Sequence, residues 1–409
     1  MPATASRSSR TPAPVEGVPT SLSGALAVAN AMRQTNPDVV AAYPITPSTI
    51  MVEKFSEYVA NGEVDTEFVA VESEHSAMSA CIGASAAGAR AQTVTSSQGL
   101  AFMWEALYVA AGLRLPIVLH TANRAISAPV SIYTEHSDTM GARDSGWIQI
   151  YAENGQEAYD NALMAVRIAE HPEVMLPVME CQDGYSVTHS VERVELLPDE
   201  TAKIFIGPYH ASNPLLDVRH PVSIGNIVSP AHLFEIKRQV VEGMDRALEV
   251  IASIGQEYGE LTGRYYGLTE GYRLDDAELV MVIIGATTGT AKVAVDTLRA
   301  RGKRVGLIKI RSFRPFPTAE IAEALEGRAA VAVMDRAFSF GASGGPLFED
   351  VCTALHRKGV WVPLTNYIYG IGGREVVPSD AAQVFLDLER IADSGQAPQN
   401  IRYLALRDE

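Results

Sequence analysis

The chain has 409 residues, of which 47% are hydrophobic and 20% charged, so it is long and apolar enough to form two or three domains with large cores. Its formal net charge of −16 disfavours direct binding to nucleic acid or to an anionic membrane surface. An acidic electron carrier would also be repelled, so the charge disfavours electron exit through this chain.

The three cysteines, Cys81, Cys181 and Cys352, lie far apart in the sequence and form no CxxC pair. This spacing excludes a cysteine-ligated iron–sulfur cluster or zinc site built by this chain alone. A sparse, odd number of cysteines is typical of a reducing cytosol, and we expect a cytoplasmic protein. No apolar run approaches the roughly 20 residues that a membrane-spanning helix needs.

Residues 1–19 are rich in Ser, Thr, Pro and Ala, and they carry Arg7 and Arg10 with no acid before Glu16. Such a composition occurs in organellar presequences, but three prolines and the lack of an amphipathic pattern favour a disordered tail.

Apolar strand-like runs then alternate with helical patterns up to residue 199. The predicted strands are 39–45, 67–71, 91–97, 116–122 and 174–181. The predicted helices are 20–34, with Ser21 or Ser23 as N-cap, 47–59, with Pro47 in its first turn, 74–90, 100–113 and 156–170. Repeated strand–helix units of this length predict a mostly parallel sheet with helices on both faces.

The alternation stops at residue 200 and resumes at residue 275. Residues 200–235 are rich in Pro and Gly, and a helical pattern covers 231–254, so 200–274 is predicted to be an arm or linker. Beyond it, strands are expected at 279–285, 305–310 and 329–335, and helices at 291–301, 317–326, 346–356 and 381–392. The fold class is therefore α/β, with two parallel-sheet domains at 20–199 and 275–409.

Three polar residues follow predicted strands of the first domain. Thr46 follows the strand 39–45, Glu74 follows 67–71, and Arg124 follows 116–122. Because the carboxyl ends of parallel strands converge on one crevice, these side chains can meet there. An arginine beside a neutral donor suits a small carboxylate substrate, and a desolvated acid suits a nitrogen-heterocycle cofactor. Taken singly, each has an ordinary alternative: an N-cap threonine, an acid decorating a helix start, and a surface loop arginine.

Two other segments bear on function. Small residues cover nearly the whole predicted helix at 76–90, which predicts burial at a subunit or domain interface. The segment 285–290, GATTGT, departs from the GxGxxG dinucleotide pattern and lacks the expected acid about 20 residues later, so it argues against a nicotinamide oxidoreductase.

At these motifs the chain resembles the α subunit of multi-subunit 2-oxoacid:ferredoxin oxidoreductases, most closely the pyruvate enzymes. The resemblance covers about residues 20–409. It rests on YPITPST (43–49), VESEHSAMSACIGASAAGAR (71–90), TSSQGLAFMWEAL (95–107), GLRLPIVLHTANRAISAP (112–129), HSDTMGARDSGWIQIY (136–151), GPYHASNPLLDVRHPVSIG (207–225), IRSFRPFP (310–317), MDRAFSFGASGGPLFEDV (334–351) and YGIGGRE (369–375).

The resemblance implies a thiamine diphosphate enzyme whose first domain binds the cofactor's pyrimidine and whose second domain is of the transketolase C-terminal type. Glu74 matches the acid that contacts the aminopyrimidine N1′, and Pro44 and Glu74 are the expected cofactor contacts. Thr46 and Arg124 match the pair that binds the substrate. The implied reaction is the reversible oxidative decarboxylation of pyruvate with coenzyme A to acetyl-CoA, CO₂ and reduced ferredoxin.

The chain contains no Gly-Asp-Gly segment for diphosphate and Mg²⁺, and no cluster ligands. The resemblance therefore implies half of an active site. A β subunit would bring the diphosphate and Mg²⁺ domain, and a ferredoxin-like δ subunit the [4Fe-4S] clusters. A γ subunit, ferredoxin as electron acceptor and a dimer of hetero-oligomers complete the expectation. Branched-chain 2-oxoacids or 2-oxobutyrate remain open as substrates, and a non-catalytic structural subunit remains open as a role.

Overall fold

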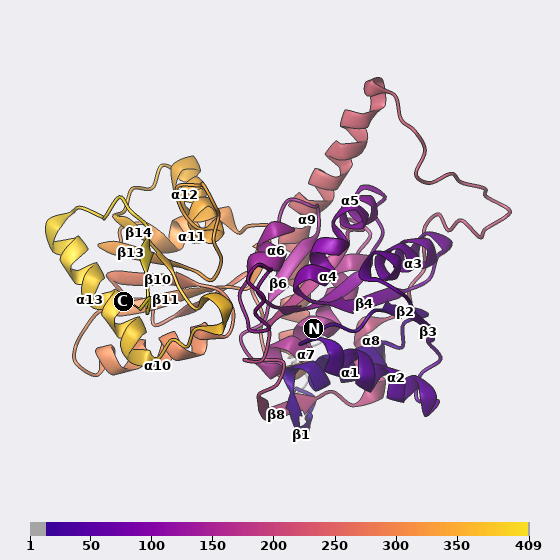
Figure 1. Cartoon of the computed structure of the whole chain (residues 1–409), viewed down its shortest axis with the longest axis horizontal. Coiled ribbons are helices and arrows are strands. Elements are labelled where there is room, and N and C mark those ends of the chain that lie inside the picture. Colours follow the sequence, from indigo (N-terminus) through magenta and orange to yellow (C-terminus); the bar gives the residue numbers. More distant parts are fainter. Residues whose placement is uncertain (1–13, 408–409) are drawn as a thin grey trace, which may run out of the picture.

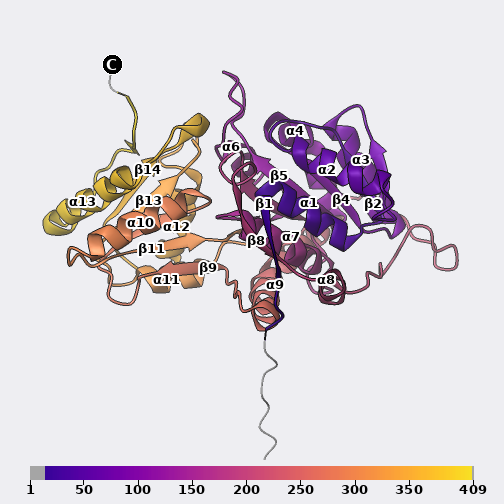
Figure 2. The same cartoon turned by 90° about the horizontal axis from the view of Figure 1, so that it is seen from below.

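The structure, a computed structural model, describes residues 14–407 of the chain. Two α/β lobes lie side by side, and a thin arm rises from the N-terminal lobe (Figure 1). The view from below separates the same two lobes and places the long helix α9 beneath the N-terminal one (Figure 2). Within the described residues, no helix combines the length and apolar character needed to cross a membrane.

The N-terminal lobe is built on a seven-stranded sheet. Its strands, in spatial order, are β12 (Ser312–Arg314), β6 (Ile148–Tyr151), β7 (Val178–Asp183), β5 (Val118–Asn123), β4 (Ala91–Thr95), β2 (Val39–Ala42) and β3 (Glu67–Ala70). All neighbours are parallel except β12, which runs antiparallel to β6 and belongs in sequence to the other lobe. A separate antiparallel pair joins β1 (Val18–Ser23) to β8 (Val191–Leu196).

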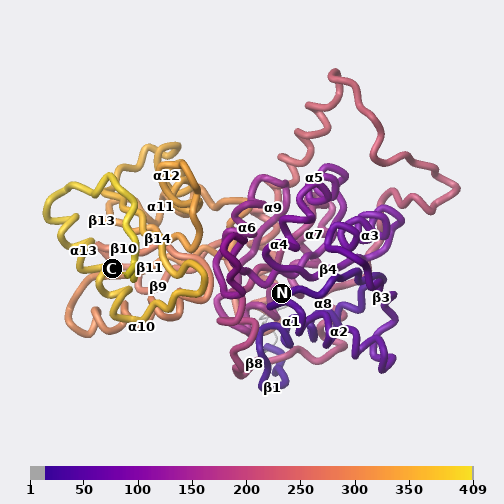
Figure 3. Tube along the Cα trace, in the orientation of Figure 1, coloured from indigo at the N-terminus to yellow at the C-terminus, as the bar shows by residue number. Residues whose placement is uncertain are grey.

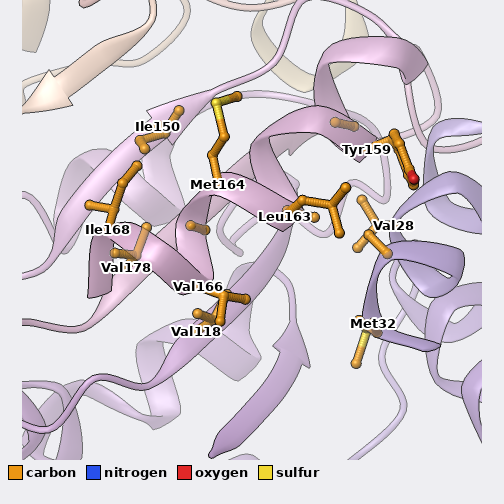
Figure 4. Packing of buried hydrophobic residues seen from close by; sticks show 14 of the residues in the cluster. Val28, Met32, Val118, Ile150, Tyr159, Leu163, Met164, Val166, Ile168 and Val178 are labelled. Carbon is orange, nitrogen blue, oxygen red and sulfur yellow. The ribbon is translucent and has the colours of Figure 1, made fainter. Parts of the chain in front are cut away.

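Helices cover both faces of this sheet. They are α1 (Gly24–Thr35), α2 (Thr49–Ala60), α3 (Glu74–Ala87), α4 (Ser97–Phe102), α5 (Trp104–Gly112), α6 (Ser137–Gly141), α7 (Gly155–Glu170), α8 (Asp199–Ile206) and α9 (Pro230–Thr262). Helix α7 is the central one, because 13 of its 16 residues are buried. Figure 4 shows its apolar side chains between α1, through Val28, and the strands, through Ile150 and Val178.

Alternate residues along each strand enter different cores, as a two-faced sheet requires. Val118 packs with α1 and α7, while Leu119 packs in the core that contains the side chains of α3 and α5. The latter core continues into the C-terminal lobe through Phe313 and Ile310. The two lobes therefore share one hydrophobic core.

The C-terminal lobe holds a six-stranded sheet. Its strands, in spatial order, are β15 (Arg402–Tyr403), β14 (Leu364–Ile368), β13 (Ala330–Asp335), β10 (Leu279–Ile283), β11 (Val305–Ile310) and β9 (Thr269–Tyr272), with only β9 antiparallel. Its helices are α10 (Thr287–Arg299), α11 (Thr318–Leu325), α12 (Pro346–Lys358), the short turn η1 (Ile371–Gly373) and α13 (Pro378–Ser394).

The expected α/β class and strand–helix alternation are confirmed, with differences at particular elements. The first helix begins at Gly24 rather than at residue 20, because residues 18–23 pair with β8; Ser23 is its N-cap and accepts from the Leu26 amide. Pro47 precedes α2, which begins at Thr49. The helix expected at 100–113 is two helices meeting at Met103. Most of the predicted tail lies outside the described residues, and Val18 and Pro19 belong to β1.

The predicted arm leaves the N-terminal lobe after α8 and returns along α9 (Figure 3). The C-terminal half of α9 is anchored by the buried carboxylate of Asp160 on α7. Asp160 accepts from Tyr258 Oη at 2.5 Å, Tyr266 Oη at 2.6 Å and Arg264 Nε at 2.7 Å. These bonds fix the chain as it passes from α9 into the C-terminal lobe.

Buried ion pairs also join the lobes. Asp183, at the end of β7, contacts His136 Nε2 at 2.7 Å, Arg336 Nη1 at 2.8 Å and the Ala286 amide at 3.1 Å. Elsewhere at this boundary Lys309 binds three acids, Glu153 at 2.9 Å, Glu157 at 2.5 Å and Glu270. The three acids lie close enough together to hold a metal ion, but the ammonium groups of Lys309 and Lys292 already pair with them and offset two of their three formal negative charges.

The pKa of Asp183 predicts an acid-sensitive contact between the lobes. Burial acts to raise this pKa, but the positive charges of His136 and Arg336 outweigh it and lower the pKa to about 2. An acid with a depressed pKa stabilises the fold above its unfolded pKa, about 3.9, and loses that effect as pH falls towards 2. We expect the stability advantage of the wild type over Asp183→Asn to shrink by ~2 kcal/mol between pH 4 and pH 2. Denaturant unfolding of both proteins across this range measures it, and a constant difference would contradict it.

Candidate active site

The loops that follow β2, β3, β4 and β5 meet at the carboxyl edge of the N-terminal sheet. Thr46 lies in the β2–α2 loop, Glu74 is the first residue of α3, and Arg124 directly follows β5. Each strand delivers its polar residue to the same edge because neighbouring strands are parallel and in register, as Val40 is with Phe68.

Arg124 is buried and is held by three protein acceptors. Its Nε donates to the Ser131 carbonyl at 3.1 Å, Nη1 to the Thr46 carbonyl at 2.8 Å, and Nη2 to Gln98 Oε1 at 3.2 Å. The structure thus brings two of the predicted residues together. The contact uses the backbone carbonyl of Thr46, which is an exposed residue.

A guanidinium group carries five N–H donors. Three of those of Arg124 are used by the contacts above, which leaves one N–H on each terminal nitrogen. Two N–H groups on separate nitrogens match the two oxygens of a carboxylate. The arrangement fixes the arginine side chain in place and keeps two donors for a small anion.

Glu74 lies beside the first turn of α4, where its side chain is close to Gly99, the residue that follows Gln98. A Cβ atom on Gly99 would lie 2.8 Å from Glu74 Oε1 and 2.4 Å from Thr95 Oγ1, so this position has no room for a side chain. Gln98 and Gly99 are adjacent, and they connect Arg124 on one side with Glu74 on the other. The predicted acid and arginine are therefore neighbours around the start of α4.

Glu74 is only 8% exposed as a residue, but its carboxylate oxygens are not fully buried. Among residues 14–407 it has no hydrogen-bond or ion-pair partner, whereas Glu72, two residues earlier, is exposed and accepts from Ser76 Oγ at 2.6 Å. The two oxygens of Glu74 are accessible and unpaired within these residues, so they are available to accept a hydrogen bond from a bound ligand. A protonated ring nitrogen of a heterocyclic cofactor fits that acceptor.

Asp138 is a site residue that the sequence did not single out. It is 4% exposed, and each of its oxygens accepts two N–H groups: Oδ1 from Asn123 Nδ2 and the Thr139 amide, Oδ2 from the amides of Ser97 and Arg124, all at 2.8–3.0 Å. Burial raises the pKa of Asp138 above its ordinary value, while these four donors oppose that rise. The carboxylate fastens the start of α4 to the backbone of Arg124.

Asp138→Asn is expected to lower the free energy of unfolding by ~2–4 kcal/mol. Whichever way the side-chain amide is turned, its NH₂ group would face two N–H groups that now donate to an oxygen of Asp138. Urea unfolding of the purified chain measures the effect. Asp144→Asn, at a carboxylate 75% exposed in the same loop region, is the matched control and is expected to change stability by less than ~0.5 kcal/mol. Equal stability of the two variants would contradict the role of Asp138.

The other residues near the predicted site have separate surroundings. Pro44 is exposed in the β2–α2 loop, two residues before Thr46. Its prediction as a cofactor contact rests on this position in the loop. His75 lies beside Phe102 and 3.9 Å from Glu105, and His136 is part of the buried contact with Asp183. At 285–290, the Ala286 amide at the start of α10 binds Asp183, a carboxylate of the chain itself.

Two family models match the chain. One describes the thiamine diphosphate-binding domain of pyruvate flavodoxin/ferredoxin oxidoreductase and matches residues 30–256; the other describes core domain II of pyruvate:ferredoxin oxidoreductase and matches residues 277–381. The chain is 51% identical to pyruvate synthase subunit PorA of Thermotoga maritima, over 95% of this chain and 98% of that protein. It is 46% identical to the PorA subunit of Methanocaldococcus jannaschii, over 91% and 95%. It is also 42% identical to ketoisovalerate oxidoreductase subunit VorA of Pyrococcus abyssi, over 94% and 97%.

Solved structures share the fold. A 2-oxoglutarate:ferredoxin oxidoreductase from Magnetococcus marinus, with 2-oxoglutarate, coenzyme A and succinyl-CoA bound, superposes with a TM-score of 0.73 at 19% identity. The match covers 90% of this chain and 65% of that one, so this chain spans about two thirds of that longer chain. An inactive tetramer of a split-gene transketolase matches with a TM-score of 0.52 at 12% identity.

Proposed function

The chain belongs to the pyruvate:ferredoxin oxidoreductase family, and we propose how it works within such an enzyme, as the α subunit that supplies one half of the active site. The enzyme is a 2-oxoacid:ferredoxin oxidoreductase of the pyruvate synthase type. It converts pyruvate and coenzyme A to acetyl-CoA and CO₂ and passes the electrons to ferredoxin, and the reaction is reversible. The observation that carries the half-site proposal is Glu74, a largely buried residue whose accessible carboxylate has no partner among residues 14–407, beside the start of α4 with Arg124 on the other side.

Thiamine diphosphate, when bound, supplies the carbon nucleophile that attacks the keto group and stabilises the negative charge left by CO₂. In our proposal, Glu74 accepts a hydrogen bond from the protonated pyrimidine nitrogen and so holds a proton at that atom. Burial strengthens this interaction, because water does not compete for the carboxylate. Pro44, in the neighbouring loop, would line the pyrimidine site. Gly99 supports the proposal, since any side chain there would meet the Glu74 carboxylate.

Arg124 and Thr46 would bind the substrate. The two free N–H groups of Arg124 would donate to the two oxygens of the 2-oxoacid carboxylate, and the Thr46 hydroxyl would donate to the substrate. Because the guanidinium group is already fixed by Ser131, Thr46 and Gln98, little side-chain entropy is lost when the substrate binds.

The rest of the assembly is proposed from the similarity to the subunits of multi-subunit enzymes. We propose a β subunit with the Mg²⁺ and diphosphate site, a δ subunit with [4Fe-4S] clusters, a γ subunit, and a cytoplasmic dimer of such hetero-oligomers. We also propose that residues 20–199 form the pyrimidine-binding domain, 200–274 the arm and linker, and 275–409 the transketolase C-terminal-like domain.

A branched-chain 2-oxoacid is the second candidate substrate, and the similarity to a ketoisovalerate oxidoreductase subunit supports keeping it. The two substrates differ in the size of the group beside the keto carbon. A pocket distinguishes one methylene by only ~1–3 kcal/mol, so few residues decide the preference.

The test is to purify the chain with its accompanying subunits and assay viologen reduction that depends on coenzyme A and a 2-oxoacid. We expect pyruvate to give the highest kcat/KM, and the co-purifying subunits to carry Gly-Asp-Gly and cysteine-rich motifs. A higher kcat/KM with 2-oxoisovalerate would replace pyruvate by the second candidate. A chain that purifies alone, without activity, would overturn the proposal.

A further inference from the structure

The glycine turn, defined here as residues Gly370–Gly373, follows β14 of the C-terminal lobe. It lies within the motif YGIGGRE (369–375), which has no part in the catalytic roles proposed above. The turn packs against residues 131–135 of the N-terminal lobe, which belong to the loop between β5 and α6. Because that loop begins with Arg124, the turn lies against the segment that carries the proposed substrate-binding arginine.

Hydrogen bonds join the turn to the loop in both directions. The Gly372 amide donates to Glu135 Oε2 at 3.0 Å, and the Gly373 amide donates to the Thr134 carbonyl at 2.9 Å. In return, Ser131 Oγ donates to the Gly372 carbonyl at 3.5 Å. Two consecutive amides of one lobe are therefore held by two consecutive residues of the other.

Glu135 supplies a buried side chain to this contact. The residue is 7% exposed. One of its carboxylate oxygens accepts from the Gly372 amide, and the other accepts from Ser137 Oγ at the start of α6. Hydrogen bonds to both oxygens, one from each lobe, fix the carboxylate in one position. Glu135 thus ties the end of the loop to the glycine turn.

Gly373 allows the two backbones to approach closely. Its φ angle is +78°, and a Cβ atom there would lie 2.3 Å from the Cβ atom of Tyr133. No side chain fits at that distance, because a Cβ atom cannot move away without its backbone. Any other residue at position 373 would separate the turn from the loop.

The residues held by the turn are the ones that support Arg124. Arg124 Nε donates to the Ser131 carbonyl at 3.1 Å, and the amide of the next residue, Ala125, donates to the Tyr133 carbonyl at 3.1 Å. The guanidinium group therefore rests on a stretch of backbone that the C-terminal lobe also holds.

The rest of the loop gives Arg124 little support. Residues 127–130 are exposed. The loop also borders a cavity of about 500 Å³, whose wall includes Ser131 and Glu135 of the loop and Phe338 and Phe340 of the C-terminal lobe. An exposed segment that borders a cavity gains little rigidity from packing. The position of the Ser131 carbonyl therefore depends on the hydrogen bonds to the glycine turn.

We propose that Glu135 is a positioning residue for substrate binding, which holds the glycine turn against the loop and thereby fixes the Ser131 carbonyl and the guanidinium group of Arg124. A displacement of about 1 Å in such a group is enough to weaken its contact with the substrate. Glu135 acts through Arg124, because its own charge would repel the carboxylate of the substrate. The inference rests on the substrate-binding role proposed for Arg124 and extends that role to a contact between the lobes.

The first experiment is steady-state kinetics of the assembled enzyme with Glu135→Ala and Glu135→Gln. We expect Glu135→Ala to raise the KM for pyruvate by about 5- to 30-fold, with kcat and the KM for coenzyme A changed by less than about twofold. Glutamine can accept from the Gly372 amide and donate to Ser137 Oγ, so Glu135→Gln should keep the KM for pyruvate within about threefold of the wild type. An unchanged KM for Glu135→Ala, or a loss confined to kcat, would overturn the proposal.

Two further variants control this experiment. Glu173→Ala is the matched control, because Glu173 is exposed and its loss should leave the KM for pyruvate unchanged. Glu135→Asp guards against a failure of Glu135→Ala to fold or assemble. Aspartate keeps the charge but is shorter by one methylene group, so it cannot reach Gly372 and Ser137 together. We expect a higher KM for pyruvate in Glu135→Asp than in Glu135→Gln, and equal values in these two variants would contradict the role of Glu135.

A double-mutant cycle with Arg124→Lys tests whether Glu135 acts through the arginine. We expect the enzyme with both Arg124→Lys and Glu135→Ala to have the same KM for pyruvate as Arg124→Lys alone, since the group that Glu135 positions is then absent. Independent, multiplicative effects would overturn the proposal. A normal KM in Arg124→Lys would overturn the proposed role of Arg124 as well, whereas a normal KM in Glu135→Ala beside a raised one in Arg124→Lys would overturn only this inference.

Discussion

Replacing Glu74 by glutamine in the assembled enzyme is expected to lower kcat for pyruvate oxidation by about 10²- to 10⁴-fold. The amide keeps the size of the side chain but carries no negative charge, so it cannot hold a proton on the cofactor's pyrimidine nitrogen. Because the Glu74 carboxylate has no partner among residues 14–407, the free energy of unfolding of the chain alone should stay the same or rise. Viologen reduction under saturating pyruvate and coenzyme A measures the first effect, and urea unfolding the second.

Glu72→Gln is the matched control for that variant. Glu72 stands two residues earlier, is exposed, and binds Ser76 at the surface of the same helix start. Loss of the Glu72 carboxylate is expected to change kcat by less than about twofold, because Glu72 is exposed and is not one of the residues grouped around the start of α4. If Glu74→Gln were as active as Glu72→Gln, the role given to Glu74 would be wrong.

The second large effect is expected from Arg124→Lys, which keeps the charge and removes the planar group. Lysine cannot reach Ser131, Thr46 and Gln98 together and still offer two donors to a carboxylate. We expect kcat/KM for pyruvate to fall by about 30- to 1,000-fold, which corresponds to ~2–4 kcal/mol, with most of the loss in KM. Steady-state kinetics with varied pyruvate gives both constants.

Coenzyme A gives an internal comparison for Arg124→Lys, because its KM should change little. Arg193→Lys, on β8 with a side chain 73% exposed, controls for the substitution itself and should match the wild type. A normal KM for pyruvate in Arg124→Lys would show that the 2-oxoacid carboxylate binds elsewhere.

Local sequence patterns were sufficient to predict most of the parallel strands and their helices. An apolar run such as 279–283 and a helix cap such as Ser23 each depend only on residues that are close together in the sequence. Such patterns could not predict β1 or β12. Residues 18–23 and 312–314 become strands only because partners far along the chain, β8 and β6, supply the hydrogen bonds. Strand β14 was also missed, because its residues 364–368 mix polar and apolar types.

The same limit applies to the site. Thr46, Glu74 and Arg124 could be proposed because each lies in the segment that follows a strand. Gln98 and Asp138 could not, because their roles arise when separate loops fold together: Asp138 accepts from Ser97, 41 residues away. A buried aspartate in a long loop after a strand was the only available signal, and it does not say which amides the carboxylate binds.

Strand β12 also bears on how this protein could be divided. It belongs in sequence to the C-terminal lobe, but it forms the last strand of the N-terminal sheet beside β6. A gene cut after α9 would encode an N-terminal half whose β6 has an unpaired edge, and such an edge recruits other strands and promotes aggregation. Splitting or recombining members of this family at that boundary would therefore require residues 312–314 to travel with the N-terminal half, or a replacement strand to be supplied.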